Sequence, residues 1–329
     1  MRSAADIEER LLVPAYASRW SSLTVAAHRM LAFPLQLRGP VRRRTVETGG
    51  RDVTLLEIGR PKLTGPLCTR LFGELPPPES EAARSLRDPL RAAGGADLVV
   101  AEVHRWMASR FRRAGWIIVP DQVRWQGELS SLPPPIPSRS LKDDLRKVRS
   151  QGYALEHAAS AGDWEEFVTT MVAPQASARF GGEAWIPSAY LLRQFAERGR
   201  LHFVVRDGDR VGGICSVRSG DTLWLPLSGV RHGDPALLRA GVSAAAWVLA
   251  MAWAKGEGCV TVDMGRTSPF FHDGVQQYKR KWGLDPRPDP LAHLAAVWVG
   301  SDAARLAFAR EPALIEREAG LWLYAGAAA

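Results

Sequence analysis

The sequence predicts a two-lobed α/β (α+β) protein in which two mixed, largely antiparallel sheets are flanked by helices. Three observations support this fold class: a proline-rich stretch near the middle of the chain, two Asp/Gly turns between β-rich runs, and a long apolar helix followed by a strand. The chain has 329 residues, of which 46% are hydrophobic, so it can form two domains with buried cores.

The proline-rich segment Ser130–Ser138 is the clearest boundary. Its Leu-Pro-Pro-Pro-Ile-Pro run can continue neither a helix nor a central strand. It predicts an N-terminal arm over 1–50, a first lobe over 51–130, a linker over 131–139, a second lobe over 140–300 and a helical tail over 301–329.

The first lobe is expected to contain a strand, a helix and two more strands. Arg51–Ile58 alternates and then runs apolar, as a strand does. Asp97 is the expected cap of a helix that reaches Ala114, because apolar residues recur at steps of three and four from Val99 onward. Two strands are expected on either side of Pro120.

The second lobe is expected to begin with a helix to Ser150, a strand, and two helices, the first of which ends at Pro174. Three β-rich runs then form an antiparallel meander. Asp207-Gly208-Asp209 and Ser219-Gly220-Asp221 separate them as hairpin turns, because Gly and Asp tolerate positive φ. A helix over 235–255 and the strand Cys259–Asp263 follow the meander.

The most informative segment comes at the end of that strand. It reads Val-Thr-Val-Asp-Met-Gly-Arg-Thr-Ser-Pro from Val260, and a short helix after Asp273-Gly274 then carries Tyr-Lys-Arg-Lys-Trp-Gly. Side chains at strand ends are held rigidly and still face a crevice. The segment resembles the signature of Fem-type (FemAB-like) acyltransferases, a branch of the GNAT superfamily. The resemblance extends over about residues 50–290 and is dense from Ser140 to Gly283.

The resemblance implies two GNAT-like lobes, with the better-formed site in the second, where the strands Thr222–Leu227 and Cys259–Asp263 would splay apart to admit the acyl carrier. Fem-type enzymes move an activated acyl group from a carrier to an amine. The expected function is therefore N-acyl transfer, with aminoacyl-tRNA or acyl-CoA as co-substrate and no permanently bound cofactor.

The stretch before the long helix favours aminoacyl-tRNA as the donor. GNAT enzymes that use coenzyme A place an Arg/Gln-x-x-Gly-x-Gly/Ala turn there, so that backbone N–H groups cradle the pyrophosphate. Arg231 and Gly233 are present here, but their spacing is wrong and Asp234 would repel a phosphate. An acyl-CoA-dependent enzyme is the alternative.

The candidate catalytic residues lie in the signature segment. Lys279 matches the family lysine and would stabilise developing negative charge or bind carrier phosphate; a solvated basic helix is the alternative. Asp263 and Arg266 are either catalytic, with Asp263 accepting an amine proton, or an ion pair that fixes the loop. His272 is the histidine expected to do acid–base work. The other candidates are Arg179, Phe180, Arg231, Arg280 and Lys281 for substrate, and Arg146, Lys147 and Arg149 for carrier phosphate.

The net charge of +8 favours anionic partners such as tRNA or a membrane surface. The apolar-rich stretch Leu11–Leu37 precedes an arginine cluster, and it either packs on the protein or makes a weak peripheral membrane contact. Scattered cysteines and the lack of a signal-peptide pattern indicate a cytoplasmic protein, and no histidine or cysteine spacing predicts a metal site. The expected acceptor is an amine-bearing small molecule or peptide. A non-catalytic GNAT-like adaptor that binds nucleic acid or an anionic surface is the contrasting hypothesis.

Overall fold

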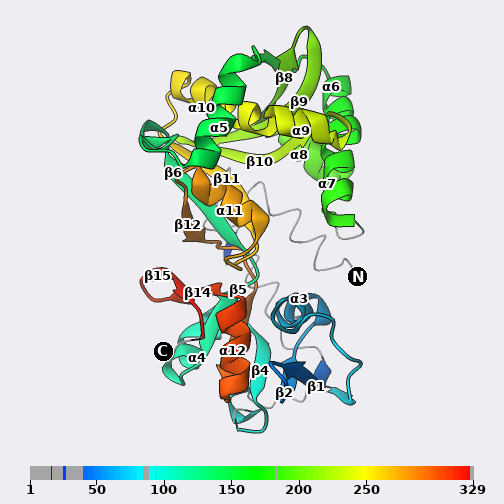
Figure 1. The fold of residues 1–329 in the computed structure, drawn as a ribbon, viewed down its shortest axis with the longest axis vertical. Helices are drawn as coiled ribbons and strands as arrows, with labels where there is room; N and C mark the ends of the chain where they lie inside the picture. The colour runs from blue at the N-terminus through cyan, green and yellow to red at the C-terminus, as the bar shows by residue number, and fades with distance from the viewer. Residues whose placement is uncertain are drawn as a thin grey trace.

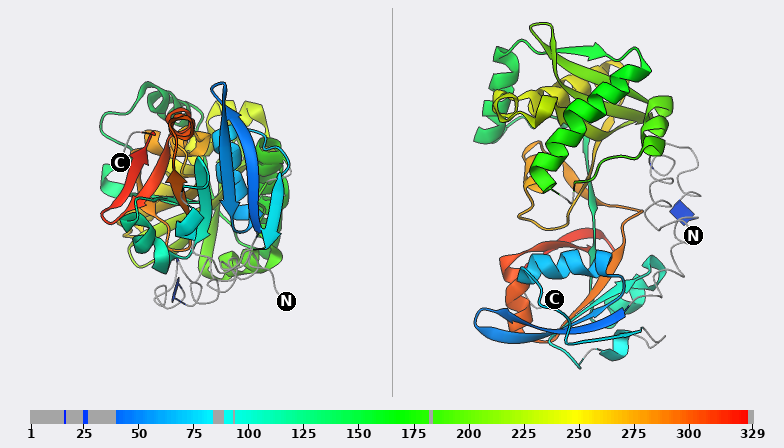
Figure 2. Two further views of the ribbon diagram at one scale, coloured as in Figure 1. Left: turned by 90° about the horizontal axis from the view of Figure 1, so that it is seen from below. Right: turned by 90° about the vertical axis from the view of Figure 1, so that its right-hand side faces the viewer.

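The computed structural model describes Tyr16, Val25, Ala26 and residues 40–83, 89–92, 94–181 and 184–326. These residues form two lobes that lie one above the other along the long axis of the molecule (Figure 1). Each lobe contains one mixed sheet with flanking helices, which confirms the predicted fold class. Figure 2 shows the two lobes from two further directions.

The first lobe contains a six-stranded sheet in the order β3-β1-β2-β4-β13-β5. Its pairs are antiparallel except for β2 and β4. The strands are β1 Pro40–Thr48, β2 Arg51–Ile58, β3 Ser80–Ala83, β4 Leu98–Val103, β5 Ile117–Pro120 and β13 Leu294–Val299. The lobe also contains the helices α3 Pro61–Phe72, α4 Ala108–Arg113 and α12 Asp302–Arg310, the 3₁₀ turns η1 Pro89–Ala92 and η2 Arg105–Met107, and the hairpin β14 Ala313–Arg317 and β15 Gly320–Tyr324.

The start of the first lobe differs from the prediction. β1 begins at Pro40, so the sheet takes in part of the expected arm, and a turn at Gly49 and Gly50, both with positive φ, leads into β2. The helix expected after Asp97 is instead β4, because Leu98–Val103 is buried along its whole length and its branched side chains suit a central strand.

The arginine cluster of the expected arm is part of this sheet. Arg42 and Arg44 are buried in β1 and pair with the fully buried Glu57 at 2.9 and 2.8 Å. These two guanidinium groups therefore stabilise the first lobe and are not available to an anionic membrane.

The second lobe contains a seven-stranded sheet in the order β12-β6-β11-β10-β9-β8-β7, in which only β10 and β11 are parallel. Its strands are β6 Val123–Glu128, β7 Ala154–His157, β8 Gly199–Arg206, β9 Asp209–Ser219, β10 Thr222–Val230, β11 Thr261–Thr267 and β12 Asp285–Pro288. The helices are α5 Arg139–Ser150, α6 Ala161–Phe167, the π-helical turn η4 Val168–Val172, α7 Ala173–Phe180, α8 Ala189–Arg198, α9 Pro235–Ala240, α10 Val242–Gly256 and α11 Gly274–Lys281, with the 3₁₀ turns η3 Leu129–Ser131 and η6 Arg231–Gly233.

Helices cover both faces of the second sheet. Residues of α5 and α10 pack in one core cluster with Val204 and Val262, whereas residues of α8 and η4 pack in another with Phe203. The expected meander is present as β8, β9 and β10.

Two helices of this lobe differ from the prediction. Pro174 does not end a helix: it stands in the first turn of α7, which continues directly from the π-helical turn η4. Gly241, with φ of 95°, divides the expected long helix into α9 and α10. Among the described residues, no helix is both long and apolar enough to cross a membrane.

The chain crosses between the sheets at places other than the proline-rich segment. It leaves the first sheet after Pro120 and enters the second at Val123, whereas Leu132 of the proline-rich segment packs in the core of the second lobe. It returns to the first sheet with β13. The two sheets thus divide the chain near 121–122 and 289–293, and the expected helical tail is a helix followed by the hairpin β14–β15.

Candidate functional site

β10 and β11 separate near the middle of the second sheet. They pair at three positions only, the last of which places Trp224 opposite Asp263. Just beyond, β10 shifts its register against β9 between Trp224 and Leu227, and β11 shifts against β6 between Asp263 and Arg266. Pairing between the two strands stops where the resemblance predicts a splay, and the signature residues lie at this point.

Asp263 is held by three donors. It is fully buried, its carboxylate pairs with Arg124 of β6, and it accepts hydrogen bonds from Gln126 Nε2 at 2.8 Å and from the Gly265 N–H at 2.7 Å. The expected ion pair with Arg266 is absent, because the neighbouring strand β6 supplies a different guanidinium. These contacts make Asp263 an anchor for the bend at Gly265 and leave it poorly placed to take an amine proton.

Arg266 pairs instead with a residue from the crossing between the lobes. Its Nε lies 2.5 Å from Oδ2 of the fully buried Asp289 and donates to the Tyr16 hydroxyl oxygen at 3.0 Å. The Tyr16 hydroxyl donates to Asp289 Oδ1 at 2.5 Å, and the Tyr16 ring meets Trp224 edge-on with centroids 5.0 Å apart. Sequence reasoning missed Tyr16, Asp289 and Arg124, since each comes from a segment distant from the signature.

Lys279 lies on the buried face of α11. It is 4% exposed, and its Nζ donates to the backbone carbonyl of Arg266 at 2.9 Å. Burial lowers the pKa of this amine from 10.5 to about 7, and the carboxylates of Asp263 and Asp273 oppose part of that change. Gln276, one turn earlier, is also fully buried, and its side-chain amide has no hydrogen-bond partner among the described residues.

The other two cations of α11 point elsewhere, as adjacent helical residues must. Lys281 pairs with Asp144 of α5 at 2.5 Å and thereby ties the two helices together. Arg280 is exposed and lies over the ring of Phe271 at 3.9 Å. His272, the expected acid–base residue, is exposed beside the same ring. The structure thus sets Lys279 apart from its basic neighbours.

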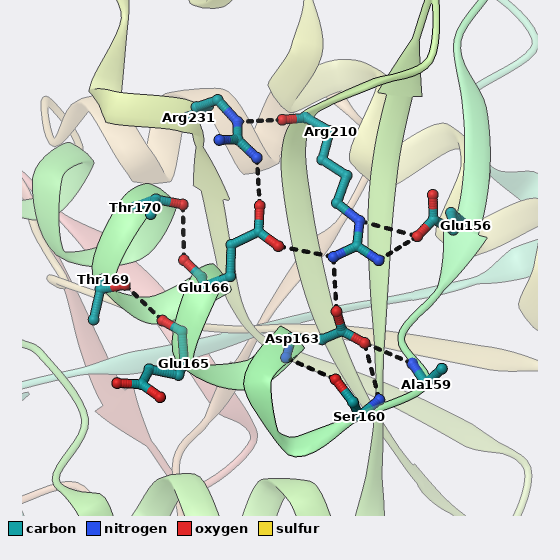
Figure 3. A network of polar contacts seen from close by, with 10 residues as sticks. All are labelled: Glu156, Ala159, Ser160, Asp163, Glu165, Glu166, Thr169, Thr170, Arg210 and Arg231. Carbon is teal, nitrogen blue, oxygen red and sulfur yellow. Dashed lines mark hydrogen bonds and ion pairs between the residues drawn. The ribbon is translucent and has the colours of Figure 1, made fainter.

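Arg231 belongs to an ion-pair network that joins α6 to the meander (Figure 3). It pairs with Glu166 of α6 and donates to the backbone carbonyl of Arg210 at 2.5 Å. Arg210 in turn pairs with Glu156, with Asp163 at 2.7 Å and with Glu166 at 2.7 Å. The hydrogen bond from Arg210 is the main cause that lowers the pKa of Asp163 to about 2. Arg231 therefore has a structural role, and the prediction that it binds substrate is not supported.

The turn after β10 is filled by the protein's own groups. The Asp234 carboxylate caps α9 by accepting from the Ala236 N–H at 2.7 Å. Gln175 Oε1 accepts from the Val230 N–H at 2.7 Å, and a Cβ at Gly233 would lie 3.1 Å from the Gln175 Cα. The backbone donors that would cradle a pyrophosphate in a coenzyme A turn are partly occupied, and a carboxylate stands among them.

The remaining candidates lie on the surface. Arg179, at the end of α7, is exposed and lies beside the start of α11, where a Cβ on Gly274 would be 3.5 Å from its Nη2. Phe180 ends α7, but its side chain falls outside the described parts of the structure.

The basic residues of α5 are largely exposed. The Arg146 side chain is 72% exposed and lies 3.6 Å from Asp143, and Arg149 is exposed as well. Lys147 is half-buried and packs beside Gly241. This helix offers a solvated basic face, separate from the buried cluster around Lys279.

A cavity of about 290 Å³ lies just past the end of β11, between the lobes. One wall is the segment Ser268–Phe270, which directly follows β11, and the other comes from α3 and the start of β13. Its lining combines apolar side chains with polar and charged groups, including Lys62, Arg70, Glu102, Asp121, Ser268 and His293. No group of three or more potential metal ligands occurs within the described ranges.

Comparison with protein families identifies part of the chain. Residues 138–280 match the sequence model of the acetyltransferase (GNAT) domain. This segment holds α5, the meander, β11 and most of α11, and so it includes the splay and Lys279. No curated protein matches the chain.

Several solved structures are similar over most of their length. L-PGS from Bacillus licheniformis is 12% identical, with a TM-score of 0.43, over 91% of this chain and 92% of that one. FemX is 12% identical, with a TM-score of 0.43, over 90% of this chain and 96% of that one. The C-terminal domain of a putative lysylphosphatidylglycerol synthetase from Agrobacterium fabrum is 12% identical, with a TM-score of 0.42, over 92% of this chain and 95% of that one. Similarity at this level carries no argument about donor or acceptor.

Proposed function

We propose that the protein, whose residues 138–280 match the acetyltransferase (GNAT) domain, is an N-acyltransferase that moves an aminoacyl group from aminoacyl-tRNA to an amine. In this reaction the amine nitrogen forms a bond to the ester carbonyl carbon. The bond from that carbon to the ribose oxygen breaks, and the ribose hydroxyl leaves with the proton that the amine loses.

The observation that carries the choice of donor is the self-capped turn after β10. An anionic pyrophosphate gains from backbone N–H groups at a helix start, but here Asp234 already accepts from the Ala236 N–H and adds a negative charge. Coenzyme A would have to displace this carboxylate. An aminoacyl-tRNA presents its ester at the end of a long acceptor strand, and its phosphates can bind elsewhere, for example along the exposed face of α5 that carries Arg146 and Arg149.

Lys279 is the residue proposed to act on the reacting atoms. Its Nζ donates to the Arg266 carbonyl, next to the bend of β11. The protonated form would stabilise the negative charge that develops on the ester oxygen in the transition state. A pKa of about 7 means that both forms of the amine are populated near neutral pH, and binding of an anionic donor favours the protonated form. Arg266 would support the same charge through its fixed guanidinium.

The cavity beyond β11 is the proposed pocket for the acceptor. It adjoins the strand that carries Arg266. It combines an apolar wall at Leu67 and Phe270 with the cationic groups of Lys62 and Arg70 and the carboxylates of Glu102 and Asp121. Such a lining suits an amine acceptor that also bears an apolar part and an anionic group. Arg70 is already paired with Glu311 at 2.9 Å, so Lys62 is the stronger candidate for the anion.

An acyl-CoA-dependent N-acyltransferase is the second candidate. The match to an acetyltransferase domain favours it, because residues 138–280 make up most of the second lobe, where the donor would bind. The self-capped turn counts against it.

The two donors are distinguished by ligand-dependent thermal unfolding. A donor that binds only the folded protein raises the unfolding midpoint, by an amount equivalent to about 2.7 kcal/mol at one hundred times its Kd. We expect aminoacyl-tRNA to raise the midpoint more than deacylated tRNA does, and acetyl-CoA to leave it unchanged. A rise with acetyl-CoA alone would transfer the assignment to the second candidate. Equal rises with charged and deacylated tRNA, without any transfer, would support the non-catalytic adaptor.

A further inference from the structure

We propose that Tyr16, which comes from the N-terminal segment, is a positioning residue of the transfer site that fixes Arg266 and, through the Arg266 backbone, Lys279. The name transfer site rests on the proposed function, whereas the positioning itself rests on contacts in the structure. The sequence suggested that this part of the chain is an arm lying on the protein or on a membrane. The structure places Tyr16, one of its side chains, on the protein, in the buried cluster at the splay.

The first argument is how completely Tyr16 is enclosed. Tyr16 is 7% exposed, although its hydrogen-bond partners lie 250 and 273 residues away in the sequence. Its hydroxyl both accepts from Arg266 Nε and donates to Asp289 Oδ1, so both functions of the phenol are used. Its ring rests against Trp224, the last residue of β10 that pairs with β11. The phenol therefore stands at the point where the two strands part.

The second argument is the charge that Tyr16 separates. Arg124 and Arg266 are register partners on the adjacent strands β6 and β11, and like charges directly opposite each other destabilise a sheet. The Tyr16 ring faces both guanidinium groups, with Arg124 Cζ 3.9 Å and Arg266 Cζ 5.5 Å from its centroid. The electron-rich face of a phenol attracts both cations. Tyr16 thus lets two opposed arginines stay in place, each with its own buried carboxylate.

The third argument links this cluster to Lys279. The Lys279 amine donates to the backbone carbonyl of Arg266, so its position depends on how that part of β11 is held. Its pKa is lowered chiefly by burial. Removing the Tyr16 ring would admit water beside Arg266, weaken the burial of Lys279 and bring its pKa back toward 10.5.

The test is an NMR titration of the Lys279 amine in the full-length protein. The chain has six lysines, so lysine labelled at Cε gives few signals, and the signal of Lys279 is identified by its loss in Lys279→Met. We compare the wild type with Tyr16→Ala, Tyr16→Phe and the control Tyr324→Phe. Tyr324 is a buried tyrosine of the first lobe that packs on Phe308.

Positioning by Tyr16 predicts that Tyr16→Ala raises the Lys279 midpoint by about one pH unit or more. Tyr16→Phe, which keeps the ring and loses both hydrogen bonds, should raise it less, and Tyr324→Phe should leave it at the wild-type value. An unchanged midpoint in both Tyr16 variants would overturn the proposal. If Tyr16→Ala does not fold, Tyr16→Phe alone decides, because a purely space-filling tyrosine would tolerate that change without moving the midpoint.

The titration needs no substrate, so its result is separate from that of the proposed function. In a transfer assay, Tyr16→Phe should lower kcat by about 10- to 100-fold with little change in donor KM, as misplacement of a catalytic group does. A shifted Lys279 midpoint in a protein that transfers nothing would support the positioning role and refute the proposed function. An unshifted Lys279 midpoint in a protein that does transfer would refute the positioning role and support the proposed function.

Discussion

Replacing Lys279 with methionine should make the protein more stable and less active at the same time. Methionine fills about the same volume and carries no charge, so it suits a site that is 4% exposed. Burial lowers the pKa of Lys279 from 10.5 to about 7, a change worth about 4–5 kcal/mol against folding when the amine is protonated. Loss of the hydrogen bond from the Lys279 Nζ to the Arg266 carbonyl costs about 1–3 kcal/mol. The net gain near neutral pH should be about 2 kcal/mol.

The dependence of this gain on pH follows from the direction of the pKa shift. The unfolded chain holds the Lys279 proton up to about pH 10.5, whereas the folded protein releases it near pH 7. Wild-type stability therefore rises with pH between these values, and the penalty is complete below pH 7. The advantage of Lys279→Met should be largest at pH 6–7 and should fade toward pH 10.

Urea denaturation of both proteins across this pH range measures the difference, with Lys281→Met as the control. Lys281 is a half-buried neighbour whose ammonium pairs with Asp144, so its loss should give no pH-dependent gain. In a transfer assay Lys279→Met should lose about 10²–10³-fold in kcat, as expected when one group that stabilises developing charge is removed. A variant that is no more stable than the wild type at pH 7, or that transfers normally, would refute this account of Lys279.

Three further variants test other parts of the structure. Asp234→Ala removes the cap of α9 and should lower the free energy of unfolding in urea by about 1 kcal/mol while leaving tRNA-dependent transfer unchanged. A gain in acetyl-CoA affinity with loss of tRNA use would contradict the choice of donor. Arg280→Ala should change neither kcat nor the urea midpoint, because Arg280 is exposed and lies over the ring of Phe271. A large loss of activity would show that α11 presents a second cation to the substrate. Arg210→Ala removes the main cause of the low Asp163 pKa, whose contribution to stability is present above about pH 4 and lost as pH falls toward 2. In an acid titration, the difference in stability between the variant and the wild type should therefore shrink over this interval. A difference that stays constant would contradict the role of the network.

Patterns within one segment were predicted well from the sequence. The meander β8–β10 followed from its two Asp/Gly turns, and Gly208 and Gly220 do adopt positive φ. The short helix α11 followed from the sequence, and the choice of Lys279 followed from the resemblance to Fem-type enzymes. The structure separates Lys279 from Arg280 and Lys281, as helix geometry requires.

The errors came from contacts between distant segments. Apolar spacing suited a helix at Leu98–Val103, but burial on both faces, which only the sheet partners β2 and β13 provide, made it a strand. Arg266 and Asp263 are near neighbours in sequence, yet each pairs with a residue of another segment. Arg266 pairs with Asp289, and Asp263 pairs with Arg124. No local pattern marks such pairs, because the fold alone brings them together. The proline-rich segment is a real break in secondary structure, but the sheets divide elsewhere.

Transfer of a labelled aminoacyl group in a single turnover tests the proposed function most directly. Excess wild-type protein is mixed with tRNA charged with ¹⁴C-labelled amino acids and a panel of primary amines, and the loss of label from tRNA is compared with the gain of labelled amide. The account predicts amine-dependent transfer that Lys279→Met reduces by about 10²–10³-fold and that Lys281→Met retains. Labelled amide formed from ¹⁴C-acetyl-CoA but not from aminoacyl-tRNA, or equal transfer by the wild type and Lys279→Met, would contradict it.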